Sequence, residues 1–157
     1  MLVHATALSA DQSAFWTTLS GLCGARFEGE SVLPRDPGDS FAGKKLVAHV
    51  AKCDADQIRV PFVVGSDTSR TWLISRTPAG LELKHDHRHA DGKPDTVTMY
   101  GGIAGPGGNA REQAFRADAY TAKLIPEAAT NVWTLTLSPD GKELTYYLER
   151  HAKPRFK

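Results

Sequence analysis

Three histidines stand within a five-residue stretch near the middle of the chain. His85, His87 and His89 are half of its six histidines, and they follow Leu81 and Leu83 at two-residue spacing. Because alternate side chains of a β-strand point to the same face, a strand here would place all five on one face. A row that is apolar at one end and carries imidazoles at the other is typical of a cavity wall that becomes polar toward its mouth. We therefore expect a small-molecule-binding cavity with His85 and His87 as polar contacts.

The same spacing also permits a metal centre. Two imidazoles at i and i+2 on a strand lie about 6–7 Å apart at Cα, and zinc enzymes built on sheets use such His-x-His pairs. On this alternative the protein is a metal-dependent, hydrolase-type enzyme with zinc as the possible metal and a histidine as general base. The candidate ligands are His85, His87 and, as a third, His49, with Asp95, Glu112 and Tyr100 as further options.

A third interpretation is purely structural. The histidines would then hydrogen-bond to backbone and to nearby carboxylates, such as Asp86, Asp91 and Asp95, at the rim of a barrel. No nucleophile is marked for a histidine to activate, because Ser69 and Ser75 lack the surrounding Gly-x-Ser-x-Gly pattern.

A second polar cluster surrounds Arg70. As a functional group, Arg70 could hold an anionic ligand through two parallel guanidinium donors beside Trp72. As a structural group, it would pair with Asp67 in a hairpin turn made by the preceding Gly, Ser, Asp and Thr residues. Tyr100 is a further candidate ligand contact. It belongs to a set of aromatics at strand spacing that either pack in the core or line a pocket: Tyr100, Trp133, Tyr146 and Tyr147.

One helix is predicted near the start of the chain, over residues 10–22. Ser9 and Gln12 match a capping box, in which each residue's side chain bonds the other's backbone N–H. The apolar stripe that follows has helical spacing and consists of Phe15, Trp16, Leu19 and Leu22.

After residue 24 the apolar period changes to two, which predicts strands. Tight turns separate about eight to ten short strands, the pattern of an antiparallel barrel or sandwich in a single domain, 1–157. The glycine-rich segment 101–108 is expected to be a flexible loop. Residues 105–110 formally fit the relaxed Gly-x-Gly-x-x-Gly/Ala dinucleotide-binding pattern, but Pro106 and the neighbouring strand pattern argue against the required strand–loop–helix context. The predicted strands are 25–32, 44–53, 58–64, 71–75, 81–89, 96–100, 111–117, 132–137 and 144–149.

A short helix followed by a strand meander resembles the calycin barrels, which include lipocalin-like and nitrobindin-like proteins. The resemblance implies a calycin-like β-barrel whose helix closes one end. Those families carry a Gly-x-Trp near the first strand, whereas this chain has Gly24-Ala25-Arg26-Phe27, with Phe27 where the tryptophan is expected. In a nitrobindin-like barrel, His151 is the positional analogue of an axial haem ligand, which makes haem a second possible cofactor after zinc.

Most of the chain also resembles a set of small, exported bacterial proteins of unknown function. The resemblance implies a periplasmic or secreted protein of the cell envelope and a chain that continues beyond Lys157, but no activity. The matching segments are Phe15-Trp16 with Leu22-Cys23-Gly24, Ser69-Arg70-Thr71-Trp72, Leu83 to His89, and Thr98-Met99-Tyr100-Gly101-Gly102.

Composition narrows the classes of partner. The 157 residues carry a net charge of +1 without a basic block, so we expect no nucleic-acid binding. No apolar run approaches the roughly 18–20 residues of a membrane span, and residues 1–10 lack the features of a signal peptide. Cys23 and Cys53 would pair in an exported protein and remain two buried thiols in a cytosolic one, and the disulfide is the favoured alternative.

Overall fold

The computed structural model describes residues 8–157, and antiparallel strands are the main regular structure of this part. The predicted mostly-β, antiparallel class with one short helix near the N-terminus is confirmed. The expectation that residues 1–10 do not form a signal peptide concerns mainly residues 1–7, which lie outside the described part. The elements are α1 (Ala10–Ser20), β1 (Arg26–Gly29), β2 (Leu46–His49), β3 (Lys52–Cys53), β4 (Gln57–Val64), β5 (Asp67–Thr77), β6 (Gly80–His87), β7 (Tyr100–Ala104), β8 (Glu112–Ala117), α2 (Ala119–Leu124), η1 (Pro126–Ala128), β9 (Val132–Leu137), β10 (Leu144–Arg150) and β11 (Lys153–Phe156).

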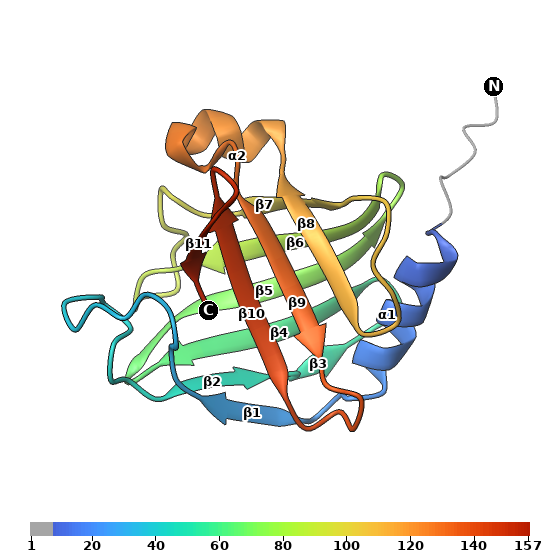
Figure 1. Cartoon of the computed structure of the whole chain (residues 1–157), viewed down its shortest axis with the longest axis horizontal. Helices are drawn as coiled ribbons and strands as arrows, with labels where there is room; N and C mark the ends of the chain where they lie inside the picture. Colours follow the sequence, from blue (N-terminus) through green and yellow to red (C-terminus); the bar gives the residue numbers. More distant parts are fainter. Residues whose placement is uncertain (1–7) are drawn as a thin grey trace.

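The strands form one sheet that curls into a half-barrel. From β4 onward each strand pairs antiparallel with the next in sequence, while β1 pairs with β2, and both β2 and β3 pair with β4. In Figure 1 strands β1 to β6 run across the view and β8, β9 and β10 cross in front of them. The segment after β1 meets the residue after β11, where the backbone of Val32 and Leu33 hydrogen-bonds to Lys157 at 2.7–3.1 Å. The curl encloses an apolar interior.

Alternation of side chains builds this interior. Along β4, Ile58, Val60, Phe62 and Val64 are buried while the residues between them are half-buried. Leu81 and Leu83 in β6 are completely buried in the same core, and His85 continues their row at 3% exposure. The face of β6 that the sequence predicts to point inward therefore lies in the core from Leu81 to His85.

Helix α1 covers the end of the half-barrel at the β5–β6 turn. Both hydrogen bonds of the Ser9–Gln12 capping box are present, so the helix begins where the sequence predicts. Its apolar stripe enters the core, with Phe15 fully buried, and the Arg76 guanidinium at the far end of β5 lies 5.6 Å from the Trp16 ring. The opposite end of the half-barrel, where β5 begins and β6 ends, is not covered by α1 and holds a cavity.

Strand β7 differs from the sequence prediction. A strand was expected at 96–100 and a flexible loop at 101–108, but the strand covers Tyr100–Ala104 and only the residues after it form a loop. The reason is steric: a Cβ on Gly101 would overlap the carbonyl oxygen of Leu83 in β6, and one on Gly102 would overlap that of Arg116 in β8. These glycines permit close strand pairing rather than flexibility.

Three smaller differences concern element boundaries. The expected strand 44–53 is broken into β2 and β3, and His89 lies beyond the end of β6. The helix α2 was not predicted, although Asp118 caps it by accepting a hydrogen bond from the Thr121 backbone N–H at 2.8 Å. A six-residue helix leaves too short an apolar period to recognise.

Cys23 and Cys53 form a disulfide with a Cα–Cα distance of 6.2 Å, which is the favoured of the two alternatives. It ties the segment after α1 to β3. Within residues 8–157, none of the helices has the length and apolar character required to cross a membrane.

Candidate functional site

A cavity of about 810 Å³ lies at the end of the half-barrel away from α1. Strands β4, β5, β6, β7, β9, β10 and β11 contribute to its wall, and residues from the loop after β1, the residue after α2 and a residue of η1 also line it. A cavity of this size matches the usual range for binding a small organic molecule. Its aromatic lining residues are Phe41, Phe62, Trp72, Tyr100, Trp133, Tyr146 and Phe156.

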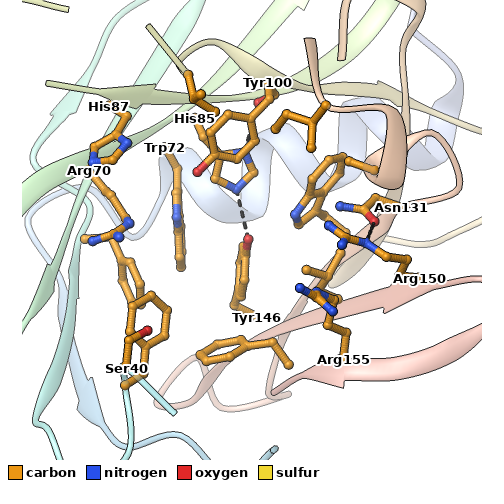
Figure 2. A pocket seen from close by; sticks show the side chains of 18 of the residues that line it. Ser40, Arg70, Trp72, His85, His87, Tyr100, Asn131, Tyr146, Arg150 and Arg155 are labelled. Carbon is orange, nitrogen blue, oxygen red and sulfur yellow. Dashed lines mark hydrogen bonds between the residues drawn. The ribbon is translucent and has the colours of Figure 1, made fainter. Parts of the chain in front are cut away.

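A stack of three rings forms one wall of the cavity. Phe62 and Trp72 stack at 4.7 Å between centroids, and Trp72 and Tyr146 stack at 4.7 Å with an interplanar angle of 11°. Phe156 meets the Tyr146 ring edge-on at 5.8 Å. Figure 2 shows the Trp72 and Tyr146 rings side by side within the cavity. Phe62 and Trp72 are buried within the stack, so the half-buried rings of the lining are the flat apolar surfaces open to a ligand: Phe41, Tyr100, Tyr146 and Phe156.

His85 lies at the base of the cavity with both ring nitrogens hydrogen-bonded. Nδ1 is 2.9 Å from the Tyr100 carbonyl oxygen, and Nε2 is 2.9 Å from the Tyr146 hydroxyl (Figure 2). A carbonyl only accepts, so Nδ1 carries the proton and Nε2 accepts from the Tyr146 O–H. The ring also stacks on Tyr100 at 4.6 Å. His85 therefore fixes the direction of the Tyr146 hydroxyl and the position of the Tyr100 backbone.

Burial controls the protonation of this pair. It lowers the pKa of His85 from 6.5 to about 4, and the charges of Arg70 and Lys84 act in the same direction. Burial also raises the pKa of Tyr146 well above its ordinary value. At neutral pH both groups are uncharged, which suits hydrogen bonding inside an aromatic cavity rather than proton transfer.

The four predicted ligand contacts all line this cavity. His85, His87, Arg70 and Tyr100 come from β6, β5 and β7, and register places Arg70 opposite His87 and Tyr100 opposite His85. Arg70 also makes the predicted structural contact, an ion pair with Asp67 at 2.8 Å, and it lies 5.2 Å from the centre of the Phe41 ring. The structural interpretation of Arg70 is therefore confirmed, and its role as a ligand contact stays a prediction.

The predicted metal ligands are not brought together. His85 has no ring nitrogen left for a metal, because both are hydrogen-bonded within the protein. His49 is absent from the cavity lining. It alternates away from Leu46 and Ala48, which face the core, and strands β4 and β5 separate its strand from β6. Within residues 8–157, no group of three or more His, Cys, Asp or Glu side chains is arranged to hold a metal ion.

The remaining histidine candidates occupy the periphery. His89 is exposed, with its Nδ1 3.9 Å from Asp95. His151, the haem-ligand candidate, sits in the tight β10–β11 turn with φ of 54° and hydrogen-bonds the Thr130 hydroxyl at 3.0 Å. It touches the edge of the cavity, and haem and zinc remain predictions from the sequence.

Sequence reasoning missed the polar residues of one side of the cavity. Asn131, Arg150 and Arg155 line it from the start of β9, the end of β10 and β11. They come from the loop before β9 and from the β10–β11 hairpin. No regular spacing in the sequence predicts that these residues lie together, because the hairpin register depends on tertiary pairing. Trp133 and Tyr146 were predicted as core or pocket aromatics, and both line the cavity, whereas Tyr147 points away and donates to Glu149 at 3.1 Å.

Comparisons with protein-family models, with curated proteins and with solved structures found no match for this chain. The geometry of the cavity is therefore the basis for assigning a function.

Proposed function

We propose that this protein binds a small, flat organic molecule in the aromatic cavity of its half-barrel. The observation that carries the proposal is the open, ring-lined cavity of about 810 Å³ itself. A barrel that served only as a scaffold would fill this volume with side chains, as the core around Leu81 and Leu83 is filled. The His85–Tyr146 hydrogen bond gives the cavity a fixed polar point at its base.

The arrangement favours binding over catalysis. His85 is buried, neutral at pH 7 and fully hydrogen-bonded, so it has no free nitrogen with which to act as a base. The other groups around it are aromatic rings that can stack on a ligand but offer no activated nucleophile. On this proposal His85 acts through hydrogen bonding rather than proton transfer.

The test is titration with N-phenyl-1-naphthylamine, an uncharged aromatic dye that fluoresces on entering an apolar site. We expect saturable binding to the wild type at one site. Ser40→Phe should weaken it at least tenfold, because Ser40 is exposed and its larger replacement would enter the cavity mouth. Ser66→Phe, an exposed turn residue outside the cavity, is the matched control and should bind as the wild type does. Absence of saturable binding, or equal binding by both variants, would refute the proposal.

We further propose that the protein works in the cell envelope, as a periplasmic or secreted binding protein. The Cys23–Cys53 disulfide supports this, because structural disulfides persist in oxidising compartments and are rare in the cytosol. Thiol titration of protein taken directly from the producing cells, unfolded under alkylating quench, should detect no free thiol if the chain is exported. Two free thiols per chain in that sample would count against export.

A further inference from the structure

The cavity has one side that is rich in positive charge. Arg150, Lys153 and Arg155 line it together with the buried side chain of Asn131, which is 3% exposed. In Figure 2 Arg150 and Arg155 lie on the same side of the aromatic rings, opposite Arg70 and His87. The two sides are therefore chemically different and can be compared directly.

On the Arg70 side, the charge is neutralised within the protein by the 2.8 Å ion pair with Asp67. On the other side, no ion pair within 4.0 Å involves Arg150, Lys153 or Arg155 among residues 8–157. Burial and the neighbouring charge of Arg155 lower the pKa of Arg150, with Glu127 opposing them. Two adjacent guanidinium groups without a close carboxylate repel each other, and an anion placed beside them would relieve that repulsion.

Asn131 orients the guanidinium group of Arg150. Its Oδ1 accepts a hydrogen bond from Arg150 Nε at 2.8 Å (Figure 2), which leaves the two terminal nitrogens of Arg150 unused. Those nitrogens, the guanidinium of Arg155 and the Nδ2 of Asn131 make no hydrogen bond within the part of the chain that the structure describes. An arginine held by Nε with its two terminal nitrogens open is suited to binding two oxygens of one acidic group through parallel hydrogen bonds.

We propose that the ligand of the cavity is an aromatic anion, a flat ring system carrying one carboxylate, sulfonate or phosphate group that binds Arg150 and Arg155. The ring would lie against the half-buried rings of Tyr146 and Phe156, and the acidic group would point toward Asn131. This inference rests on the proposed binding function and adds the chemical class and orientation of the ligand.

The test compares two probes that share one aromatic skeleton. N-Phenyl-1-naphthylamine is uncharged, and 8-anilinonaphthalene-1-sulfonate is the same skeleton with a sulfonate. We expect the wild type to bind the sulfonate more tightly. Arg155→Gln and Arg150→Gln should each weaken sulfonate binding about tenfold or more, because a charge-assisted hydrogen bond is lost, and leave binding of the uncharged probe within about twofold. The exposed Arg116→Gln on the outside of β8 is the matched control and should change neither affinity.

The outcomes separate this inference from the proposed function. If the uncharged probe binds but neither glutamine variant changes the preference for the sulfonate, the anion assignment is wrong and the binding function stands. If neither probe binds the wild type, both fail. Arg150→Gln also removes the bond to Asn131, so Arg150→Lys, which keeps the charge, should retain more sulfonate affinity than Arg150→Gln. Thermal melts of each variant verify that the fold is intact.

Discussion

At the scale of single residues, the hydrogen bond between Tyr146 and His85 links the cavity to its supporting strands. Tyr146→Phe would leave the buried Nε2 of His85 without a donor, and a buried unsatisfied polar atom costs about 1–3 kcal/mol. We expect urea denaturation to show a loss of that size. Tyr147→Phe is the matched control, since its hydroxyl points outward to Glu149 and should contribute less than about 0.5 kcal/mol. Equal losses for the two variants would show that the His85 contact is not specific.

The protonation of His85 makes stability depend on pH. Its pKa is about 4 in the folded protein and 6.5 when unfolded, so between these values the unfolded chain binds more protons. Stability is therefore fully present above pH 6.5 and is lost as pH falls toward 4, by about 3 kcal/mol from this residue. The difference in unfolding free energy between wild type and His85→Gln should shrink over that window. A difference that stays constant from pH 7 to pH 4 would mean that His85 does not remain neutral in the fold.

The candidate site was predictable at this scale only in part. Period-two spacing predicted one row from Leu81 to His89. The strand carries it from Leu81 to His87, and His85 and His87 line the cavity, but His89 lies beyond the strand. The spacing gave no warning that Tyr146, from a strand far along the chain, would take up the second nitrogen of His85. That contact depends on how the sheet curls, and it removes the free ligand atom that a His-x-His metal site requires.

At the scale of elements, β7 depends on two glycines. Gly102→Ala would force a Cβ into the carbonyl oxygen of Arg116, which only a separation of β7 from β8 could relieve. We expect a loss of more than about 4 kcal/mol, large enough to abolish soluble folded protein. Gly29→Ala in β1 meets nothing within 4 Å and should change stability by less than about 1 kcal/mol. A soluble Gly102→Ala variant with an unchanged melting temperature would contradict the close pairing.

Elements with a strong local signal were predicted well. Helix α1 has a capping box and an apolar stripe, and β4 and β9 have strict alternation, so local chemistry alone predicts them. The prediction missed strand β7 because a glycine-rich sequence normally indicates a loop. Its strand conformation comes from pairing with β6 and β8, which the sequence does not reveal. The prediction also missed helix α2, because six residues carry too little periodicity, although the Asp118 cap was a usable signal.

At the scale of the whole molecule, the disulfide joins the end of α1 to the sheet. It closes a loop with a sequence separation of 30, and the chain-entropy treatment assigns such a loop about 3–4 kcal/mol. The double variant Cys23→Ser, Cys53→Ser should lose that amount in urea denaturation, with the native far-UV spectrum retained. Reducing agent should lower the wild-type melting temperature and leave the double variant unchanged. A wild type insensitive to reduction would show that the bond does not constrain the unfolded chain.

The curl of the sheet produces an aromatic cavity at the end opposite α1. The three tryptophans provide a direct probe of it, because Trp72 and Trp133 line the cavity while Trp16 packs in α1 at the other end. Each indole N–H gives its own signal in a ¹H–¹⁵N NMR spectrum. The distinction between the two ends can therefore be read in a single sample without any substitution.

The decisive measurement is a titration of ¹⁵N-labelled protein with N-phenyl-1-naphthylamine, followed through these three indole signals. We expect the Trp72 and Trp133 signals to shift and saturate together while the Trp16 signal stays in place. No shift at a saturating dye concentration, or equal shifts of all three signals, would contradict a ligand-binding cavity at this end of the half-barrel.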